Sequence, residues 1–201
     1  MSRRPNPRAE MLRQAVAEEA GRIMHEQGVD DFLLAKRKAA ERLGVVDGSI
    51  LPRNTEIEAA LMARQRLFSA DQHAADIAAL RRAALEAMLL LADFQPRLVG
   101  PVLTGTASAH SEINLHLFAE TPESVFLRLE ERGIPHQLLE RRLRFERERS
   151  VTFPALRFVA GQQPVDAVVF PLDGIRQSPF SPVDGRPMRR ASAAEIRALL
   201  D

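Results

Sequence analysis

The spacing of apolar residues changes character about halfway along the chain. In the first half they recur every three or four positions, which is typical of amphipathic helices. The helices predicted there cover residues 9–27, 31–43, 55–68 and 71–93. In the second half apolar and polar residues alternate, as they do along half-buried strands. The strands predicted there cover residues 97–104, 112–118, 136–145, 151–159 and 165–170.

Capping signals mark the starts of three helices. Thr55–Glu58 matches a capping box, in which a hydroxyl and a carboxylate satisfy the first backbone N–H groups of a helix. Thr121 followed by Pro122 predicts the start of a helix between the second and third strands. Ser192–Glu195 is a second capping box, and it predicts a short helix at the end of the chain.

This order of elements predicts an α+β fold, in which a helical N-terminal region packs on a small mixed β-sheet. We expect the helical region to span residues 1–70 and a second, sheet-containing domain to span residues 71–201. A chain of 201 residues is long enough for this division. Residues 171–187 are rich in proline and predict a loop before the last helix.

Composition narrows the chemistry that the chain can perform. Hydrophobic residues make up 45% and charged residues 27%, which is typical of a globular protein. The absence of cysteine excludes disulfides, iron–sulfur clusters, thiolate zinc sites and cysteine nucleophiles. Any metal must therefore be a hard cation on carboxylates, or an ion bound by some of the five histidines.

The distribution of apolar residues predicts a cytoplasmic protein without a membrane partner. The longest apolar run, Ala87–Ala92, is far shorter than the ~20 residues that cross a bilayer. Met1–Pro5 leads into a polar helix without the apolar centre of a signal peptide, so we do not expect export. The net charge of +1 gives no overall signal for nucleic-acid binding.

One segment carries the most distinctive polar pattern. Residues 98–115 read LVGPVLTGTASAHSEINL, an apolar strand and a glycine, then a second glycine with a small residue, then alternating polar residues. The positions that matter are Gly100, Gly105, Thr106, Ser111, Glu112 and Asn114. Their spacing resembles, without gaps, the nucleotidyltransferase signature of the DNA polymerase β superfamily. Residues 34–44 and 181–192 also resemble segments of a group of proteobacterial nucleotidyltransferase-like proteins.

The resemblance implies a nucleotide-binding site with a role for each matching residue. Glu112 and Asn114 stand where the family has its first two aspartates, and Asp166 matches the third carboxylate on a later strand. These three would be the catalytic and Mg²⁺-binding residues. The small residues of the motif would bind a nucleoside triphosphate, and they are Gly100, Gly105, Thr106 and Ser111. The implied activity is metal-dependent transfer of a nucleotide to an unidentified acceptor, such as a protein or an RNA.

Physical chemistry explains the pattern and the importance of two departures from it. Carboxylates at i and i+2 of a strand point to the same side and can bridge two magnesium ions. Asn114 lacks the charge that such a bridging ligand supplies, whereas Glu112 can still bind magnesium. Pro101 replaces the family's serine and offers neither a hydroxyl nor a backbone N–H.

Two interpretations therefore stay open. The chain is a nucleotidyltransferase-like enzyme with weakened or lost activity, or a non-catalytic nucleotide-binding or protein-interaction module on the same scaffold. His116 shares a predicted strand face with Glu112 and Asn114, where it is either a general base or a hydrogen-bonded sheet residue. A group of arginines would bind a triphosphate or protect an edge strand, namely Arg141, Arg142, Arg144, Arg147 and Arg149.

Overall fold

The computed structural model describes residues 7–29, 31–68, 70–109, 111–146 and 149–201. It confirms the predicted α+β class, because helices accompany one five-stranded mixed sheet. The contacts between residues divide the chain into two compact units. The first, the helical unit, comprises Met1–His73 and Pro182–Asp184, and the second, the sheet unit, comprises Ala74–Ser181 and Gly185–Asp201.

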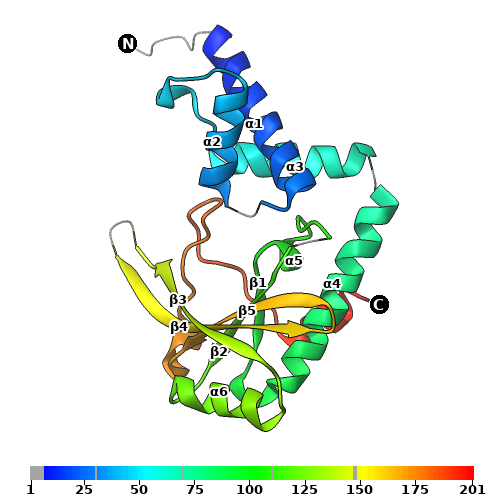
Figure 1. The fold of residues 1–201 in the computed structure, drawn as a ribbon, viewed down its shortest axis with the longest axis vertical. Coiled ribbons are helices and arrows are strands. Elements are labelled where there is room, and N and C mark those ends of the chain that lie inside the picture. Colours follow the sequence, from blue (N-terminus) through cyan, green and yellow to red (C-terminus); the bar gives the residue numbers. More distant parts are fainter. Residues whose placement is uncertain (1–6, 30, 69, 110, 147–148) are drawn as a thin grey trace. The chain divides into compact units, whose positions relative to one another are not determined.

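In the described part of the chain, three helices lie wholly within the helical unit (Figure 1). They are α1 (Pro7–Gln27), α2 (Phe32–Arg42) and α3 (Asn54–Phe68), with a short 3₁₀ turn, η1 (Gly48–Ile50), between the last two. Small and branched side chains fill the space between them, and the fully buried ones are Val16, Ala20, Ile23, Ala35, Ala39 and Ile57. The Asp31 side chain accepts a hydrogen bond from the N–H of Leu34 and so begins α2, as the capping preference of aspartate favours.

The capping box predicted at Thr55 is wrong. Helix α3 begins one residue earlier, at Asn54, and the Glu56 carboxylate accepts a hydrogen bond of 2.6 Å from the N–H of Arg53. A cap at Thr55 would bind the N–H of Ile57 or Glu58, but the N–H of Ile57 already donates to the carbonyl of Arg53 at 3.3 Å, so Thr55 lies inside the helix. Asn54 also donates a hydrogen bond of 2.6 Å to the carbonyl of Pro182, in the short segment that joins this unit.

Helices α1 and α3 approach closely at Gly21. A Cβ on Gly21 would lie 3.0 Å from the backbone nitrogen of Leu61. We expect Gly21→Ala to lower the free energy of unfolding by about 1–2 kcal/mol, although alanine in a helix is otherwise favoured over glycine by about 1 kcal/mol. Urea denaturation followed by far-UV circular dichroism measures the change. Gly48→Ala is the control, because a Cβ there meets no atom within 4 Å; a stabilised Gly21→Ala would contradict the prediction.

The sheet unit is organised around five strands. They are β1 (Arg97–Val99), β2 (Ile113–Phe118), β3 (His136–Arg144), β4 (Ser150–Ala160) and β5 (Gln163–Phe170). Their order across the sheet is β1-β2-β5-β4-β3. Strands β2 and β5 are parallel, and the other neighbours are antiparallel. The parallel pair at the centre brings residues of β2 beside residues that follow about fifty positions later, which positions the candidate site.

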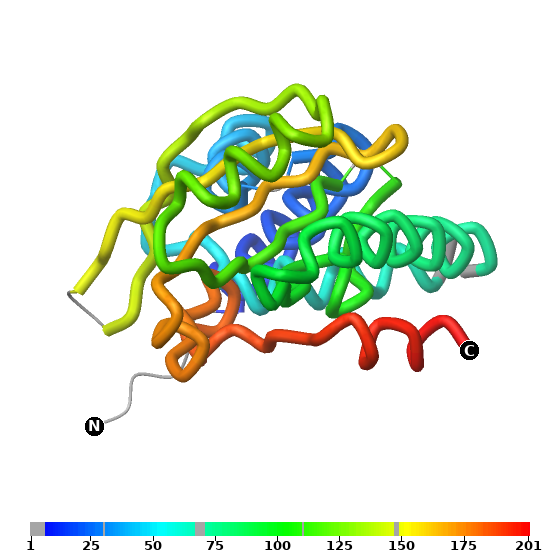
Figure 2. Tube along the Cα trace, turned by 90° about the horizontal axis from the view of Figure 1, so that it is seen from below, coloured from blue at the N-terminus to red at the C-terminus, as the bar shows by residue number. Residues whose placement is uncertain are grey.

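Helices cover one face of this sheet. They are α4 (Ala70–Leu90), α6 (Pro122–Glu131) and the short C-terminal α7 (Ala193–Ala198), and Figure 2 shows α7 in red beside α4. Alternate residues of β2 point into the resulting core, and Ile113, Leu115 and Leu117 are all 0% exposed. The capping box at Ser192 is confirmed, since its hydroxyl and the Glu195 carboxylate each accept a hydrogen bond from the other's N–H. No helix in the described ranges meets the length and hydropathy needed to span a bilayer.

The strand predicted over residues 97–104 is wrong in its second half. Strand β1 ends at Val99, and residues Gly100–Thr104 form a short helix, α5. Gly100 has a φ of 72°, a left-handed conformation that glycine adopts readily, and Pro101 occupies the first turn of α5. Proline cannot donate to a strand ladder, so the two residues together end β1 and start a helix. Val102 and Leu103 are still buried, which explains the apolar pattern.

Candidate functional site

Polar residues form a row across the face of the sheet opposite the helices. Asn114 of β2, Asp166 of β5 and Arg157 of β4 are neighbours in register, because Asp166 is paired with each of the other two. Their neighbours along each strand, such as Ile113 and Val165, point into the helix-covered core. Parallel pairing of β2 with β5 therefore brings together the residues that the motif predicted on separate strands.

The Arg157 guanidinium lies between the two acids of the motif. Its Nη2 is 2.8 Å from Glu112 Oε1 and 3.1 Å from Glu112 Oε2. The same nitrogen is 3.8 Å from Asp166 Oδ2. Both carboxylates thus converge on one cationic group of the protein itself, at the place where the resemblance implies a metal ion.

A second arginine reaches the same acid from the edge of the sheet. Arg141 of β3 donates from Nε to Asp166 Oδ1 at 3.3 Å, and its Nη2 makes a short contact with Asp166 Oδ2. This two-pronged geometry is the strongest that arginine forms with a carboxylate. The Asp166 side chain is only 5% exposed, whereas those of Arg141 and Arg157 are 36% and 41% exposed. We call these four residues, including Glu112, the arginine–carboxylate cluster.

The cluster is electrically balanced without an added ion. Its two carboxylates carry two negative charges, and its two guanidinium groups carry two positive charges. In the described ranges of the chain, no group of three histidine, aspartate or glutamate side chains is placed to hold a metal ion. The donor set therefore does not fit the two-metal centre that the resemblance implies, because each carboxylate already has a cationic partner.

Asn114 packs against the turn at Gly100 and supplies no charge to the cluster. A Cβ on Gly100 would lie 3.3 Å from Asn114 Nδ2, so this side chain and the turn are in close contact. Asn114 Nδ2 also donates a 3.3 Å hydrogen bond to the backbone carbonyl of Glu112. The side-chain amide of Asn114 therefore stabilises the local backbone. At this position the resemblance implies a metal-binding aspartate.

The second glycine turn is closed on itself. Three successive N–H groups donate to the carbonyl of Pro101: Gly105 at 2.8 Å, Thr106 at 3.0 Å and Ala107 at 3.2 Å. The hydroxyls of Thr104 and Thr106 are 3.0 Å apart. The backbone N–H groups that were expected to bind a phosphate therefore form hydrogen bonds within the turn. The left-handed conformation of Gly105, whose φ is 83°, directs them toward the carbonyl of Pro101.

Ser111 is likewise committed to its own loop. Its hydroxyl accepts a hydrogen bond of 3.0 Å from the N–H of Ser108, and its N–H donates to the carbonyl of Ser108 at 3.0 Å. Both serines are buried. Because each uses a hydrogen-bonding group to hold the loop before β2, this pair fixes the approach of the chain to Glu112.

His116 is a buried sheet residue held by an arginine from the C-terminal segment. Arg190 Nε donates to His116 Nδ1 at 3.0 Å, so the neutral ring carries its proton on Nε2. Burial, and to a smaller extent the charge of Arg190, lower the pKa of His116 to about 3. Burial also lowers the pKa of Arg190 to about 10. His116 therefore has the hydrogen-bonded structural arrangement rather than that of a base poised near neutral pH.

Arg190 ties the C-terminal segment to the sheet. Its Nη1 donates to the carbonyls of Gly174 and Ile175, at 2.9 and 3.2 Å. Its guanidinium lies over the rings of Phe118 and Phe170, 4.9 and 5.1 Å from their centroids. These contacts assign Arg190 to anchoring the segment that contains the short helix η3 (Leu172–Arg176).

The sequence interpretation missed Arg157, the residue that most changes the site. Among the five arginines singled out on and after the third predicted strand, Arg141 belongs to the cluster, and Arg147 lies outside the described residues. A signal for Arg157 was present, because it stands between Leu156 and Phe158 in a strand whose alternate residues enter the core. A charge at that position must point to the other face, where Glu112 and Asp166 also point.

Comparisons of the chain with protein-family models, with curated proteins and with solved structures find no match.

Proposed function

We propose that this chain is a nucleotidyltransferase-like protein that binds a nucleoside triphosphate without metal and does not transfer it. The motif spacing around Gly100, Gly105 and Glu112 supports the scaffold assignment. One observation carries the loss of metal chemistry: the Arg157 guanidinium occupies the position between Glu112 and Asp166. We infer that in the arginine–carboxylate cluster the guanidinium of Arg157 takes the role of the metal ion that the resemblance implies.

Electrostatics supports this replacement. A magnesium ion between the two acids would have to displace Arg157 and break a charge-assisted contact of 2.8 Å with Glu112. The displaced guanidinium would then lie beside a divalent cation, and like charges at that distance repel. With Asn114 in place of the second aspartate, the site lacks the negative charge to offset this cost.

The same arginines provide the means to bind phosphate. The side chains of Arg141 and Arg157 are 36% and 41% exposed, so part of each side chain faces solvent. A guanidinium has five N–H donors, more than its carboxylate partner accepts, and it suits the oxygens of a phosphate group. The triphosphate would bind through these remaining donors, while Glu112 and Asp166 hold the two side chains in place.

The direct test is nucleotide titration by isothermal calorimetry, with EDTA or with magnesium. We expect the dissociation constant to change less than about threefold between the two conditions. Arg157→Met should weaken binding about tenfold, since a charge-assisted contact is worth roughly 1.5 kcal/mol or more. Arg142→Met is the matched control, because Arg142 is exposed and alternation directs it to the other face of β3. Absence of binding by any of the four common triphosphates would refute the proposal.

The alternative function is metal-dependent nucleotide transfer to a protein, an RNA end or a small molecule. It is favoured by the convergence of Glu112 and Asp166 on one point, which a single ion would occupy if Arg157 moved away. The discriminating assay incubates the protein with labelled nucleoside triphosphates, manganese and cell extract. Transfer that disappears in Glu112→Ala and in Asp166→Ala would establish the enzyme and overturn the metal-free proposal.

A further inference from the structure

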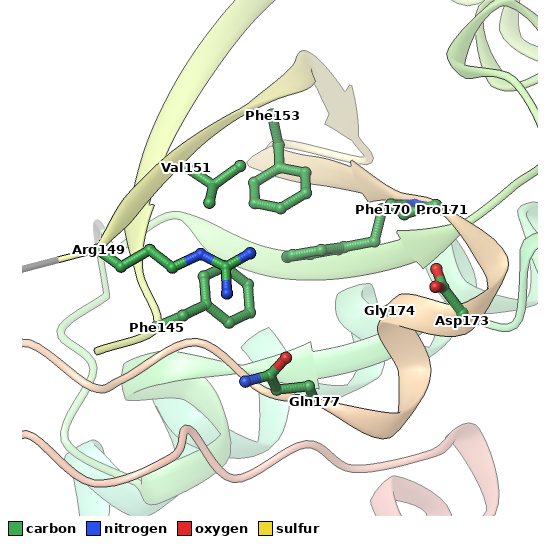
Figure 3. A pocket seen from close by; sticks show the side chains of 9 residues that line it. All are labelled: Phe145, Arg149, Val151, Phe153, Phe170, Pro171, Asp173, Gly174 and Gln177. Carbon is green, nitrogen blue, oxygen red and sulfur yellow. The ribbon is translucent and has the colours of Figure 1, made fainter.

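A pocket opens on the same face of the sheet unit as the cluster, toward the other end of the strands. Its volume is about 230 Å³. The lining comes from the hairpin between β3 and β4 and from the segment that runs from the end of β5 through η3. The residues are Phe145, Arg149, Val151, Phe153, Phe170, Pro171, Asp173, Gly174 and Gln177 (Figure 3).

Aromatic rings make up the inner part of the pocket. The ring centroid of Phe153 is 4.6 Å from that of Phe170 and 5.8 Å from that of Phe145, with tilts of 44° and 52°. Phe118 lies behind Phe170, at a centroid distance of 5.8 Å. Phe170 is 1% and Phe145 9% exposed, so these rings form the buried floor of the pocket. The half-buried Phe153 is the ring that a flat aromatic guest would contact.

Polar groups converge on this aromatic surface from its rim. Figure 3 shows Arg149 extending from the hairpin across the opening, while Asp173 and Gln177 project from the opposite segment. Among the described residues, neither Asp173 nor Gln177 forms a side-chain hydrogen bond or ion pair within the protein. Within the described part of the chain, Arg149 has a long ion pair of 3.8 Å with Glu146, in which both side chains are exposed. These three polar groups therefore remain available to a ligand.

The polar side chains at the rim indicate which hydrogen-bonding groups a ligand should carry on the edge of its ring. The Gln177 amide offers a donor and an acceptor side by side, which pairs with a heterocycle that presents the complementary two groups. The Asp173 carboxylate only accepts hydrogen bonds, so it favours a guest with an amino group on its ring. The Arg149 guanidinium only donates hydrogen bonds, so it favours a guest with acceptor atoms on its ring. A flat amino-heterocycle with ring acceptors meets all three requirements.

We propose that this pocket binds the base of a nucleotide whose ring carries an exocyclic amino group. The choice of a nucleobase among flat amino-heterocycles rests on the proposed function, whereas the pocket itself does not. The volume agrees with one ring system, because pockets for whole drug-sized ligands are larger, at about 300–1,000 Å³. The ribose and phosphates of the ligand stay outside the pocket.

The base pocket and the arginine–carboxylate cluster are separate subsites on one strand face. Phe170 and Asp166 lie four positions apart on β5, and at ~3.3 Å per residue this places them about 13 Å apart. A nucleoside, which has no phosphate, engages the pocket alone. Inorganic tripolyphosphate engages the cluster alone. The two proposals can thus fail independently.

The experiment is titration of adenosine and uridine in EDTA, followed by isothermal calorimetry. We expect adenosine to bind at least fivefold more tightly than uridine, whose ring carries no amino group. Asp173→Ala should remove this preference. Phe153→Leu should weaken adenosine binding about tenfold, because it keeps an apolar side chain but removes an aromatic face. Val159→Ala, at an exposed position farther along β4, is the control and should leave binding unchanged.

Several outcomes would overturn the base pocket. One is absence of adenosine binding at millimolar concentration by protein that is folded by circular dichroism. Another is adenosine binding that neither Phe153→Leu nor Gln177→Ala weakens. If tripolyphosphate binds and nucleosides do not, the base pocket is wrong while the proposed function stands. If adenosine binds, tripolyphosphate does not bind, and no nucleotide binds more tightly than its nucleoside, the proposed function is wrong while the pocket stands.

Discussion

Acidification from pH 7 to pH 4 is expected to lower the free energy of unfolding by about 3 kcal/mol through His116 alone. The residue is 2% exposed, and its pKa is lowered to about 3 by burial first and by Arg190 second. Its Nδ1 accepts the hydrogen bond from Arg190, and protonation there would set two donors against each other. The folded protein therefore resists this proton.

The sign of the effect follows from linkage. The unfolded chain takes up the His116 proton near pH 6.5, whereas the folded chain does so only near pH 3. Between these values the unfolded state binds more protons, so stability falls as the pH falls. The contribution is fully present above pH 6.5 and is lost progressively down to pH 3, at up to ~1.4 kcal/mol per pH unit.

Urea denaturation at a series of pH values, compared between the wild-type protein and His116→Gln, isolates this contribution. Glutamine retains an oxygen that can accept from Arg190 but does not titrate. We expect the free energy of unfolding of the variant to fall less steeply between pH 6 and pH 4, because the contribution of His116 is absent. Parallel pH profiles in the two proteins would contradict the prediction. The ring proton shifts of His116, followed by NMR, give an independent readout of its titration.

Arg141→Met is expected to lower the free energy of unfolding by about 2 kcal/mol. The substitution removes both hydrogen bonds that Arg141 donates to Asp166 and leaves a carboxylate that is 4% exposed. Breaking a fully buried ion pair costs more, at about 3–5 kcal/mol, but the Arg141 side chain is 36% exposed and water offsets part of the loss. The remaining contact to Arg157, at 3.8 Å, is too long to compensate.

A double-mutant cycle with Asp166→Val tests the origin of this effect. If the cost comes from the unpaired buried carboxylate, Arg141→Met should cost much less in the presence of Asp166→Val, with a coupling of about 1–2 kcal/mol. Arg142→Met serves as the control and should change stability by less than about 0.5 kcal/mol, as exposed surface substitutions do. Additive single effects would show that Arg141 stabilises the sheet independently of Asp166.

Local patterns were sufficient to locate most elements. The alternation of Ile113, Leu115 and Leu117 predicted a strand with one buried face, and all three are completely buried. The box Ser192–Glu195 predicted the start of α7, because the hydrogen bonds that cap a helix join residues three apart. Such signals depend only on near neighbours along the chain, so they survive whatever the tertiary structure is.

Local patterns did not distinguish a strand from a short helix where both would bury the same apolar residues. Val102 and Leu103 are buried either in a strand or in a short helix, and the sequence interpretation chose the strand. The left-handed conformation of Gly100 and the proline after it decide for the helix α5. These two residues were recognised as part of a motif, and their effect on the backbone is the physical reason for the change of element.

The sequence by itself determined the α+β class and the face of the sheet to which the polar candidates point, although Glu112 lies just before β2, which begins at Ile113. Period-two alternation suffices for this, since Glu112, Asn114 and Asp166 occupy alternate positions from buried apolar residues. Only the tertiary structure decided what these acids do. The guanidinium between Glu112 and Asp166 comes from Arg157, which lies 45 positions after Glu112, and strand register alone brings it there. Register depends on the packing of the whole sheet, and so the motif could not reveal that an arginine stands between the two acids.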